Sequence, residues 1–461
     1  MAEIRGMTVA ENQIVRDLTA ELLAKARRNK LRSRYMDGKA AVRALSPMLP
    51  PYLRNIGACL GWPAKAVEAL ARRTRLDGFA IPGSDLASFG LPDLLTANDY
   101  ITEVRQTEVS ALIHAVSWEV VTAGGPGEPD ALITYKSALD GTGTWNARTR
   151  RLDSFLSVNR RDDMGEPVDF ALYLPGETII VEKRAVVDRS THQLWVPVHP
   201  VRYKPRRDRV FGQSRITRPV MFLTGAAVKS MLRMEGTADF YGTPHLLLLG
   251  ATLDQFQGAS GQAVSTWDFL MSKINGIPDD DDMKSPRADV KEITQATQQP
   301  HLDQLDEIAA AFAGETGIPV SSLGVGVKQA NPTSAESYQA SREDLIAESE
   351  DAQDSFGWAH VRSVQDLWLL ASGETKLPAE MLKLRPIWRD ARNPSRAAVA
   401  DSTQKLVTAF PWMAESDAIL DTIGLEPSLV ERLRAEKARA QARTTLATVL
   451  GQPGTPNAVQ G

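Results

Sequence analysis

The hydrophobic pattern of this chain changes abruptly near Gly212. Before this point, residues 116–210 contain short runs rich in valine, isoleucine and aromatic residues, separated by glycine, proline, aspartate and asparagine, which is typical of strands. After it, apolar residues recur every three or four positions along residues 215–240, so that they would lie on one face of a helix. These residues are Val220, Leu223, Ala227, Met231, Met234 and Ala238. A chain that combines both patterns is expected to belong to the α+β class.

The same periodicities predict the other elements. Helices are expected at 9–46, 62–73, 262–273, 301–313 and 335–372, a strand at 75–81, and mainly helix at 377–449. Two amphipathic helices, near 215–240 and 301–313, therefore bracket a small mixed insertion. The last residues, 451–461, are rich in glycine, proline and polar residues, and we expect them to be disordered.

The overall composition limits the classes of protein to consider. A length of 461 residues corresponds to about three domains, and a formal net charge of −4 offers no general attraction for nucleic acid. The single cysteine, Cys59, cannot form a disulfide within the chain and lies in an apolar run, so we expect it to be buried. The N-terminus does not resemble a signal peptide, and no apolar run approaches the ~20 residues of a membrane span. We therefore expect a soluble protein from a reducing compartment.

Motifs that would indicate an enzyme are incomplete. Residues 324–328 contain two glycines and a lysine, but they lack the preceding strand and the following serine or threonine of a phosphate-binding loop. The six histidines show no pair at the spacing of metal ligands on a helix, which favours surface positions or hydrogen-bonded core positions. They are His114, His192, His199, His245, His301 and His360. The sequence predicts no catalytic residue, no metal site and no cofactor.

Two clusters of charge remain to be interpreted. Asp279, Asp280, Asp281 and Asp282 form a contiguous run beside Pro278, which favours a solvated loop; the alternatives are a docking loop for a basic partner or an incidental cation site. Residues 202–218 contain seven lysines and arginines and a single acid. This tract favours either an exposed strand and turn that aid solubility, or a surface that contacts phosphates or an acidic neighbouring subunit.

A series of short motifs occurs along the chain in a fixed order. They are 34–42, which contains an Asp-Gly-Lys turn after Tyr35, then 62–79, 107–121, 211–216, 312–337 and 388–405. In the fifth motif a helix ends in Gly-Ile-Pro, Leu-Gly follows, and a polar loop leads through Asn-Pro-Thr-Ser-Ala-Glu to a long helix. Together the motifs resemble the portal proteins, or head-to-tail connector subunits, of long-tailed double-stranded DNA bacteriophages of the actinobacteriophage type. The resemblance covers about residues 15–445, although Met36 stands where a second aromatic residue is common.

This resemblance implies a portal fold with an α/β wing, a two-helix stem, a small mixed clip insertion and a helical crown. The implied boundaries are 1–214 for the N-terminal part of the wing, 215–240 for the first stem helix, 241–298 for the clip and 299–319 for the second stem helix. They continue with 320–334 for a tunnel loop, 335–375 for a wing helix, and 376–461 for the crown and a disordered tail.

The resemblance also implies two sets of site residues. The DNA-contacting tunnel loop would contain Gly324, Val325, Gly326, Val327, Lys328, Gln329, Ala330 and Asn331. The partner-docking residues of the clip would be Asp279, Asp280, Asp281 and Asp282.

The implied function is that of a structural conduit. About twelve copies of the chain would form a ring at one capsid vertex of the virion, assembled in the host cytoplasm, through which double-stranded DNA is packaged and ejected. The implied partners are terminase, head-completion (adaptor) proteins, and the major capsid and scaffolding proteins, with no membrane. The alternatives are a metal-dependent nuclease or another DNA-packaging enzyme, and a minor head protein without a channel. A closed ring in solution would distinguish the portal from these alternatives.

Overall fold

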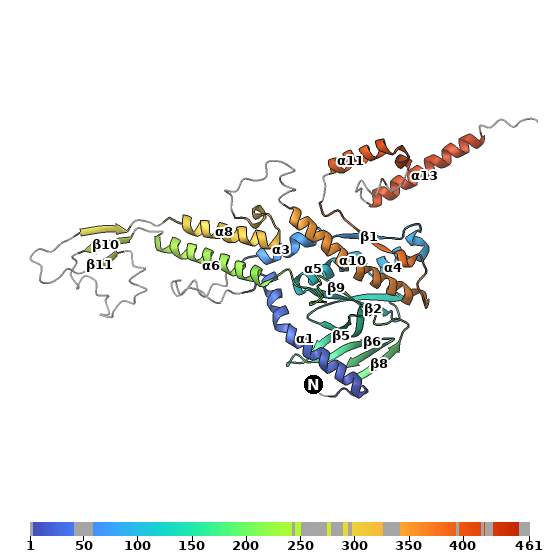
Figure 1. The fold of residues 1–461 in the computed structure, drawn as a ribbon, viewed down its shortest axis with the longest axis horizontal. Coiled ribbons are helices and arrows are strands. Elements are labelled where there is room, and N and C mark those ends of the chain that lie inside the picture. Colours follow the sequence, from blue (N-terminus) through green and yellow to red (C-terminus); the bar gives the residue numbers. More distant parts are fainter. Residues whose placement is uncertain are drawn as a thin grey trace, which may run out of the picture. The chain divides into compact units, whose positions relative to one another are not determined.

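The computed structural model describes residues 3–40, 59–241, 245–249, 274–277, 289–293, 297–325, 342–392, 396–415, 419 and 427–450. The chain divides into two compact units, Met1–Ala391 and Arg392–Gly461. The α-helices described in the first unit are α1 (Val9–Met36), α3 (Trp62–Ala71), α4 (Leu91–Ala97), α5 (Tyr100–His114), α6 (Arg218–Tyr241), α8 (Gln299–Thr316) and α10 (Glu343–Ser372), with 3-10 helices η1 (Leu86–Phe89), η3 (Val320–Leu323) and η4 (Met381–Lys383) (Figure 1).

The described strands of the first unit form four small sheets. Their bounds are β1 (Leu76–Ala80), β2 (Val116–Ala123), β3 (Ala131–Ser137), β4 (Gly141–Asn146), β5 (Arg151–Arg161), β6 (Pro167–Leu174), β7 (Glu177–Glu182), β8 (Ala185–Thr191), β9 (Val198–Arg202), β10 (His245–Leu249), β11 (Ile274–Ile277), β12 (Asp289–Ile293) and β13 (Arg385–Trp388). Strands β4 to β8 form an antiparallel meander, and β3-β2-β9 form a second antiparallel sheet. The strand-rich character predicted for residues 116–210 and the α+β class are both confirmed.

Helix α1 packs on the five-stranded meander. Its start is fixed by a capping box, in which Glu11 N–H donates to Thr8 Oγ1 (3.3 Å) and Thr8 N–H donates to the Glu11 carboxylate (2.8 Å). Val15, Leu18 and Leu22 are buried against apolar residues of β5, β6 and β7. One face of α1 is thereby committed to the core, and the opposite face is left to solvent.

The end of α1 differs from the prediction. The helix was expected to continue to residue 46, but it ends at Met36. Gly38 adopts a φ of +65°, and Lys39 N–H donates to the Arg34 carbonyl (2.7 Å), which closes the last turn. An Asp-Gly pair is therefore the stop signal here, and residues 41–46 lie outside the described residues.

The long helix α10 joins the sheets to the remaining helices. It packs against β2, β3, β9, β13 and α3. Phe356 on α10 is fully buried in a cluster that also contains Trp62 of α3, Tyr203 and Phe312 of α8. The helix predicted at 335–372 is thus confirmed over Glu343–Ser372, and residues 335–341 lie outside the described residues.

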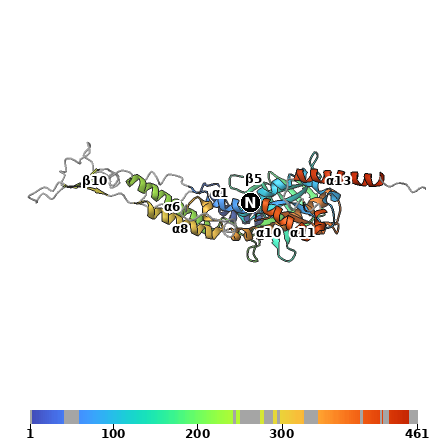
Figure 2. The same cartoon turned by 90° about the horizontal axis from the view of Figure 1, so that it is seen from above.

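Helices α6 and α8 form an antiparallel pair, which Figures 1 and 2 both show side by side. Between them in the sequence lies a sheet of order β11-β10-β12, in which β10 pairs parallel with β11 and antiparallel with β12. This arrangement confirms the prediction of two helices that bracket a small insertion. The helix predicted at 262–273 lies outside the described residues.

The buried face of α6 is not the apolar stripe that the sequence suggests. Val220 and Ala227 are buried as expected, but Met231 is 41% exposed. Val228 and Leu232 are buried instead. The side of the helix that is covered is determined by contacts with α3 and α8, which a one-dimensional pattern does not contain.

Two further expectations were wrong. Cys59 is exposed and not buried, and it lines a small pocket with Tyr35 and Thr224. Residues 385–388, which were included in a mainly helical region, form strand β13 and pair antiparallel with β1. The pairing partner is more than 300 residues away in the sequence, so local periodicity could not reveal it.

The second unit is helical in the residues that the structure describes. It contains α11 (Arg396–Ala409), η5 (Pro411–Glu415) and α13 (Pro427–Leu450). The prediction of helix in this part of the chain is confirmed for α11 and α13.

Candidate functional site at the root of the α6–α8 pair

Side-chain hydrogen bonds fix the register of α6 against α8. Thr217 Oγ1 donates to Glu315 Oε1 (3.0 Å) at one end of the pair. Farther along, Ser230 Oγ donates to Gln304 Oε1 (2.9 Å). These bonds set which residues of the two helices lie at the same height.

Arg215, two residues before Thr217, anchors the root of the pair. Its side chain is 5% exposed, and its Nε donates to the Ala66 carbonyl of α3 (2.7 Å). Its Nη2 donates to the Thr316 carbonyl at the end of α8 (2.7 Å), and its Nη1 forms an ion pair with Glu348 of α10. One guanidinium therefore connects α3, α8 and α10 at the start of α6, which suits the planar fork of arginine.

Glu348 is held ionised by this contact. Burial alone would raise its pKa, but the charge of Arg215 and hydrogen bonds from Arg215, Lys204 and Tyr203 lower the pKa below the ordinary value of a glutamate. Burial also raises the pKa of Tyr203, which remains a hydrogen-bond donor. The cluster is a structural anchor, because every polar group that meets Arg215 is satisfied within the chain.

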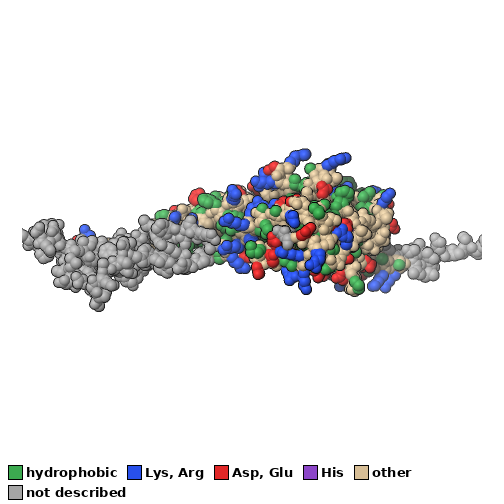
Figure 3. Space-filling model, turned by 90° about the horizontal axis from the view of Figure 1, so that it is seen from below, with side chains coloured by type: hydrophobic (Ala, Val, Ile, Leu, Met, Phe, Trp, Pro, Cys, Tyr) green, Lys and Arg blue, Asp and Glu red, His purple; other side chains and the backbone are tan. Residues whose placement is uncertain are grey.

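An open groove with a basic lining runs beside this root, between α1, residues 208–217, α6 and α8. Its basic lining residues are Lys25, Arg27, Arg28, Lys30, Arg32, Arg34, Arg209, Arg218, Lys229 and Arg233, whereas its acids among the described residues are Asp208 and Glu315. The view from below shows many Lys and Arg side chains on this face of the molecule, interspersed with Asp and Glu (Figure 3). The local charge of the groove is therefore strongly positive although the whole chain is acidic.

Two pKa values reflect this local field. Burial and the neighbouring charges of Arg28 and Arg209 lower the pKa of Arg32 to about 10. Burial and the charge of Arg32 lower the pKa of His114 to about 4, so that this histidine is neutral at physiological pH. Accumulated cations at one surface disfavour further positive charge, and an anionic partner would relieve this repulsion.

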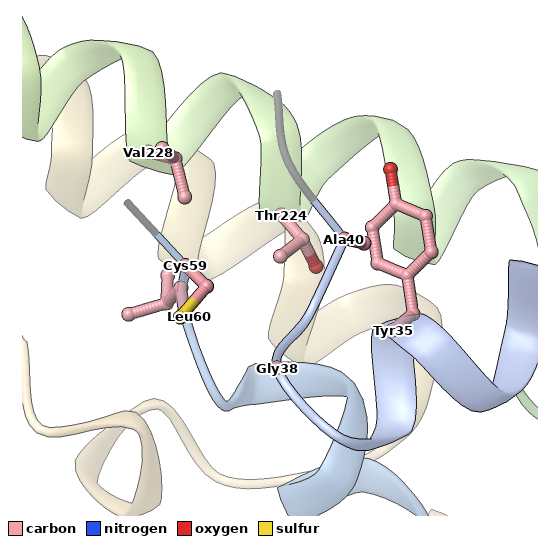
Figure 4. Close-up of a pocket in the computed structure, with 7 residues that line it drawn as sticks. All are labelled: Tyr35, Gly38, Ala40, Cys59, Leu60, Thr224 and Val228. Carbon is pink, nitrogen blue, oxygen red and sulfur yellow. The ribbon is translucent and has the colours of Figure 1, made fainter. Parts of the chain in front are cut away.

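A small pocket lies beside the groove, between the end of α1, Leu60 before α3, and α6 (Figure 4). Tyr35, Gly38 and Leu60 line it together with Thr224 and Val228 of α6. It has no cluster of titratable groups, so it does not indicate a catalytic site.

The described residues contain one fully buried cluster of titratable groups that resembles a catalytic site in composition. His360 of α10 lies 2.8 Å from Glu119 (Nδ1 to Oε1) and 3.3 Å from Glu108 (Nε2 to Oε1), and Ser363 Oγ donates to Glu119 (2.5 Å). Burial opposes a charge on His360, but the two carboxylates outweigh it and raise its pKa to about 10. Because all three charged side chains are sealed in the core, the cluster ties α5, β2 and α10 together and cannot meet a substrate. This confirms the core interpretation for His360.

The predicted tunnel-loop residues are only partly described. Gly324 ends η3 with a φ of +76°, and Val325 packs at the edge of the core cluster around Trp62. Trp62 Nε1 donates to the Leu323 carbonyl (3.3 Å), which ties the start of this segment to α3. Gly326, Val327, Lys328, Gln329, Ala330 and Asn331 lie outside the described residues, as do Asp279, Asp280, Asp281 and Asp282.

The tract 202–218 divides into residues with different roles. Arg215 is buried and intramolecular, and Arg202 stacks on Trp145 with its guanidinium 4.7 Å from the ring centroid. Arg209 and Arg218 line the groove. The contribution of α1 to the groove was missed at the level of sequence, although the basic run 27–34 is the signal that points to it.

The described residues offer neither a metal-binding cluster nor a membrane-spanning helix. No group of three or more histidine, cysteine, aspartate or glutamate side chains in this part of the chain could hold a metal ion. Among the same residues, no helix has the length and apolar character needed to cross a membrane.

Comparison with known proteins identifies a family. Residues 16–414 match the family described as phage portal protein, SPP1 Gp6-like. The "Portal protein" of Mycobacterium phage L5 is 25% identical over 383 residues, which are 81% of this chain and 77% of that protein. The "Portal protein" of Mycobacterium phage D29 is 25% identical over 468 residues, covering 97% of this chain and 94% of that protein.

Among solved structures, this chain is similar to one titled "Neck of native GTA particle computed with C12 symmetry". The TM-score is 0.35 and the identity 14%, with 86% of this chain and 99% of that chain covered. A second, "Neck of empty GTA particle computed with C6 symmetry", gives a TM-score of 0.33 and 14% identity over the same shares of the two chains.

Proposed function

Since the chain belongs to the SPP1 Gp6-like family of phage portal proteins, we propose that its copies close into a ring whose channel carries double-stranded DNA into and out of the capsid. The observation that carries this proposal is the family match, which spans residues 16–414 and so includes the α6–α8 pair and most of the first unit. Portal proteins are structural components of the virion. A ring of about twelve subunits is the form that the proposal takes.

The division of the chain follows from the same proposal. The wing would comprise 1–214 together with the helix at 335–375, and the stem would comprise 215–240 and 299–319. The clip would be 241–298, the tunnel loop 320–334, and the crown with its tail 376–461. The paired helices α6 and α8 and the small sheet between them in sequence support this division, because they have the order that a stem and clip require.

Size in solution tests the ring. Sedimentation or mass photometry of the purified chain should show a closed assembly of about twelve copies, and negative-stain images should show rings with a central hole. A stable monomer or dimer at moderate salt would contradict the proposal. It would favour the alternatives of a DNA-packaging enzyme or a minor head protein without a channel.

The tunnel loop provides a test of DNA contact. We propose that residues 324–331 line the channel and that Lys328 supplies one mobile positive charge per subunit, which exchanges phosphates without a bidentate grip. Lys328→Ala should leave assembly intact, because an exposed loop residue rarely changes stability by more than ~0.5 kcal/mol. It should alter DNA packaging or retention. Crosslinks from position 328 that reach only capsid protein, and never DNA in filled heads, would count against this role.

The acidic run provides a test of partner docking. We propose that Asp279, Asp280, Asp281 and Asp282 face outward from the clip and help to bind terminase during packaging and the head-completion proteins afterwards. Replacing all four by serine should weaken at least one of these two interactions, measured with the purified partner. Unchanged binding of both partners would remove the acidic run from the docking surface.

A further inference from the structure

Helix α6 carries an uncovered face along the basic groove. Phe222, Ala226, Lys229 and Arg233 follow one another at spacings of four, three and four residues, which places them on one side of the helix. Phe222 is 74% exposed, and neither Lys229 nor Arg233 has an ion-pair partner among the described residues. The face thus carries the two cations at one end. At the other end it carries the large apolar side chain of Phe222 next to the small Ala226.

Helix α8 carries a face with the complementary pattern. Asp303, Glu307, Ala310 and Gly314 have the same spacings of four, three and four residues, and they lie on the side of α8 that points away from its buried stripe. The helix contains four acids and no lysine or arginine. Asp303 and Glu307 have no ion-pair partner in the described part of the chain. A pair of anions therefore stands at one end of this face and small residues at the other.

The register of the pair places these two faces at matching heights. Ser230 bonds to Gln304, so Arg233 lies within about one turn of the height of Asp303, and Lys229 within about one turn of the height of Glu307. The same antiparallel order brings Phe222 toward the level of Gly314, where the absence of a side chain leaves room for a ring. Rotation about a ring axis keeps every residue at its height, so a helix pair aligned with that axis presents the α6 face to the α8 face of the next copy.

The neighbouring elements continue the same division of charge. On the α6 side, Arg27 and Arg28 of α1 line the groove. On the α8 side, Gly317 at the end of the helix lies against Asp344 of α10, and Asp351 and Asp354 are exposed farther along α10. One side of the first unit is therefore basic from α1 to α6, and α8 and α10 form an acidic surface.

We propose that the α6 face of one subunit packs against the α8 face of the next, with Lys229 and Arg233 paired to Glu307 and Asp303 of the second copy. This inference rests on the proposed ring and names the surfaces that close it. Such a contact is heterologous, because two different faces meet. Repeated heterologous contacts generate a closed ring when the rotation from one copy to the next divides a full turn into a whole number of steps.

A second copy of the chain explains the observations better than DNA does. A phosphate backbone could neutralise the groove, but it would leave the acidic face of α8 without a partner. A neighbouring subunit satisfies both faces at once, and it also covers Phe222. DNA in the groove and coverage by residues 41–58 of the same chain are the other outcomes that an experiment must distinguish.

Charge reversal with rescue tests the contact. Lys229→Glu with Arg233→Glu, and separately Asp303→Lys with Glu307→Lys, should each abolish the ring in mass photometry at physiological salt, while circular dichroism shows a folded chain. Combining all four substitutions should restore the ring, because the charges are then exchanged and not removed. Arg206→Glu with Arg207→Glu is the matched control: it makes the same change of net charge at exposed positions outside the groove lining, and the ring should remain.

Crosslinking separates the possible occupants. In a Cys59→Ser background, Lys229→Cys combined with Glu307→Cys should give a ladder of covalent multimers on mild oxidation. Monomers closed by an internal disulfide, or no crosslink at all in an intact ring, would overturn the proposal. So would a ring that survives both reversals, or a ring that the fourfold variant fails to restore although each variant folds. If the parental chain itself forms no ring, the proposed function fails; a parental ring with unaffected variants rejects only this contact.

Discussion

Replacing Arg215 by methionine should destabilise the first unit by about 3 kcal/mol. Methionine fills a similar volume but donates no hydrogen bond, so the Ala66 and Thr316 carbonyls and the Glu348 carboxylate lose a buried donor. Removing one partner of a buried ion pair costs about 3–5 kcal/mol. The low end applies here because Tyr203 and Lys204 still reach Glu348.

The loss should be measured by urea unfolding at pH 7, at one protein concentration and in a shared oligomeric state, with tryptophan fluorescence as the signal. Arg207→Met is the control, since Arg207 is exposed and should change stability by less than ~0.5 kcal/mol. Adding Glu348→Gln to Arg215→Met should recover about 1–2 kcal/mol, because a neutral amide needs no counter-charge. Equal unfolding midpoints for Arg215→Met and Arg207→Met would refute the anchoring role.

The same ion pair has a pH signature of known sign. The pKa of Glu348 is lower in the folded chain than in the unfolded chain, so its contribution is present above the unfolded value of about 4.3 and is lost as the pH falls through the folded value. The difference in stability between the parental chain and Arg215→Met should therefore shrink in acid. A difference that stays constant from pH 7 to pH 3 would mean that Glu348 is not paired with Arg215.

Three further changes follow from the packing. Phe312→Ala empties a fully buried site and should cost about 3–5 kcal/mol in urea unfolding, and a cost below 1 kcal/mol would place this side chain outside the core. Gly212→Ala should lower the midpoint of thermal unfolding much more than Gly83→Ala. Both glycines have φ near +80°, so the backbone strain is similar, but a Cβ at Gly212 would lie 2.1 Å from the Tyr203 carbonyl oxygen, whereas nothing lies within 4 Å of a Cβ at Gly83. The pKa of His360 is raised to about 10, so the stability that its charge contributes is complete below about pH 6.5 and is lost as the pH rises toward 10. His360→Gln should therefore remove this loss of unfolding free energy at alkaline pH. If the variant loses stability at alkaline pH as the parental chain does, another group is responsible.

Local patterns predicted much of the fold because the residues that cause them are neighbours in sequence. The change of period near Gly212 correctly placed the strand-rich region before α6, and the spacing of apolar residues located α6, α8 and α10. Helix ends depended on finer chemistry: the Asp37-Gly38 turn stops α1 ten residues before the predicted end, since glycine accepts the left-handed backbone there. The β1–β13 pair was not predictable, because it joins segments that share no local pattern.

The candidate site was harder to predict because its parts are far apart in the chain. The basic groove combines α1 with α6 and residues near Arg209, which lie about 180 residues from Arg28. Sequence spacing gave equal weight to every cation of 202–218, yet Arg215 is committed to the core. Burial decides which charges remain available to a partner, and burial is a property of the folded chain.

A formal net charge of −4 indicates no general attraction for nucleic acid, and the folded chain shows that this sum hides strong local charges. Net charge adds the basic groove beside α6 to the acidic α8 and cancels them, whereas in the proposed contact a neighbouring subunit would meet each surface separately. Segregated charges of opposite sign on one subunit favour head-to-tail contacts and disfavour two-fold ones, in which like surfaces would face each other. A chain that assembles in this way needs no excess of either sign. The same segregation predicts that assembly weakens as salt rises, because exposed pairs lose most of their attraction once the screening length falls to a few ångströms.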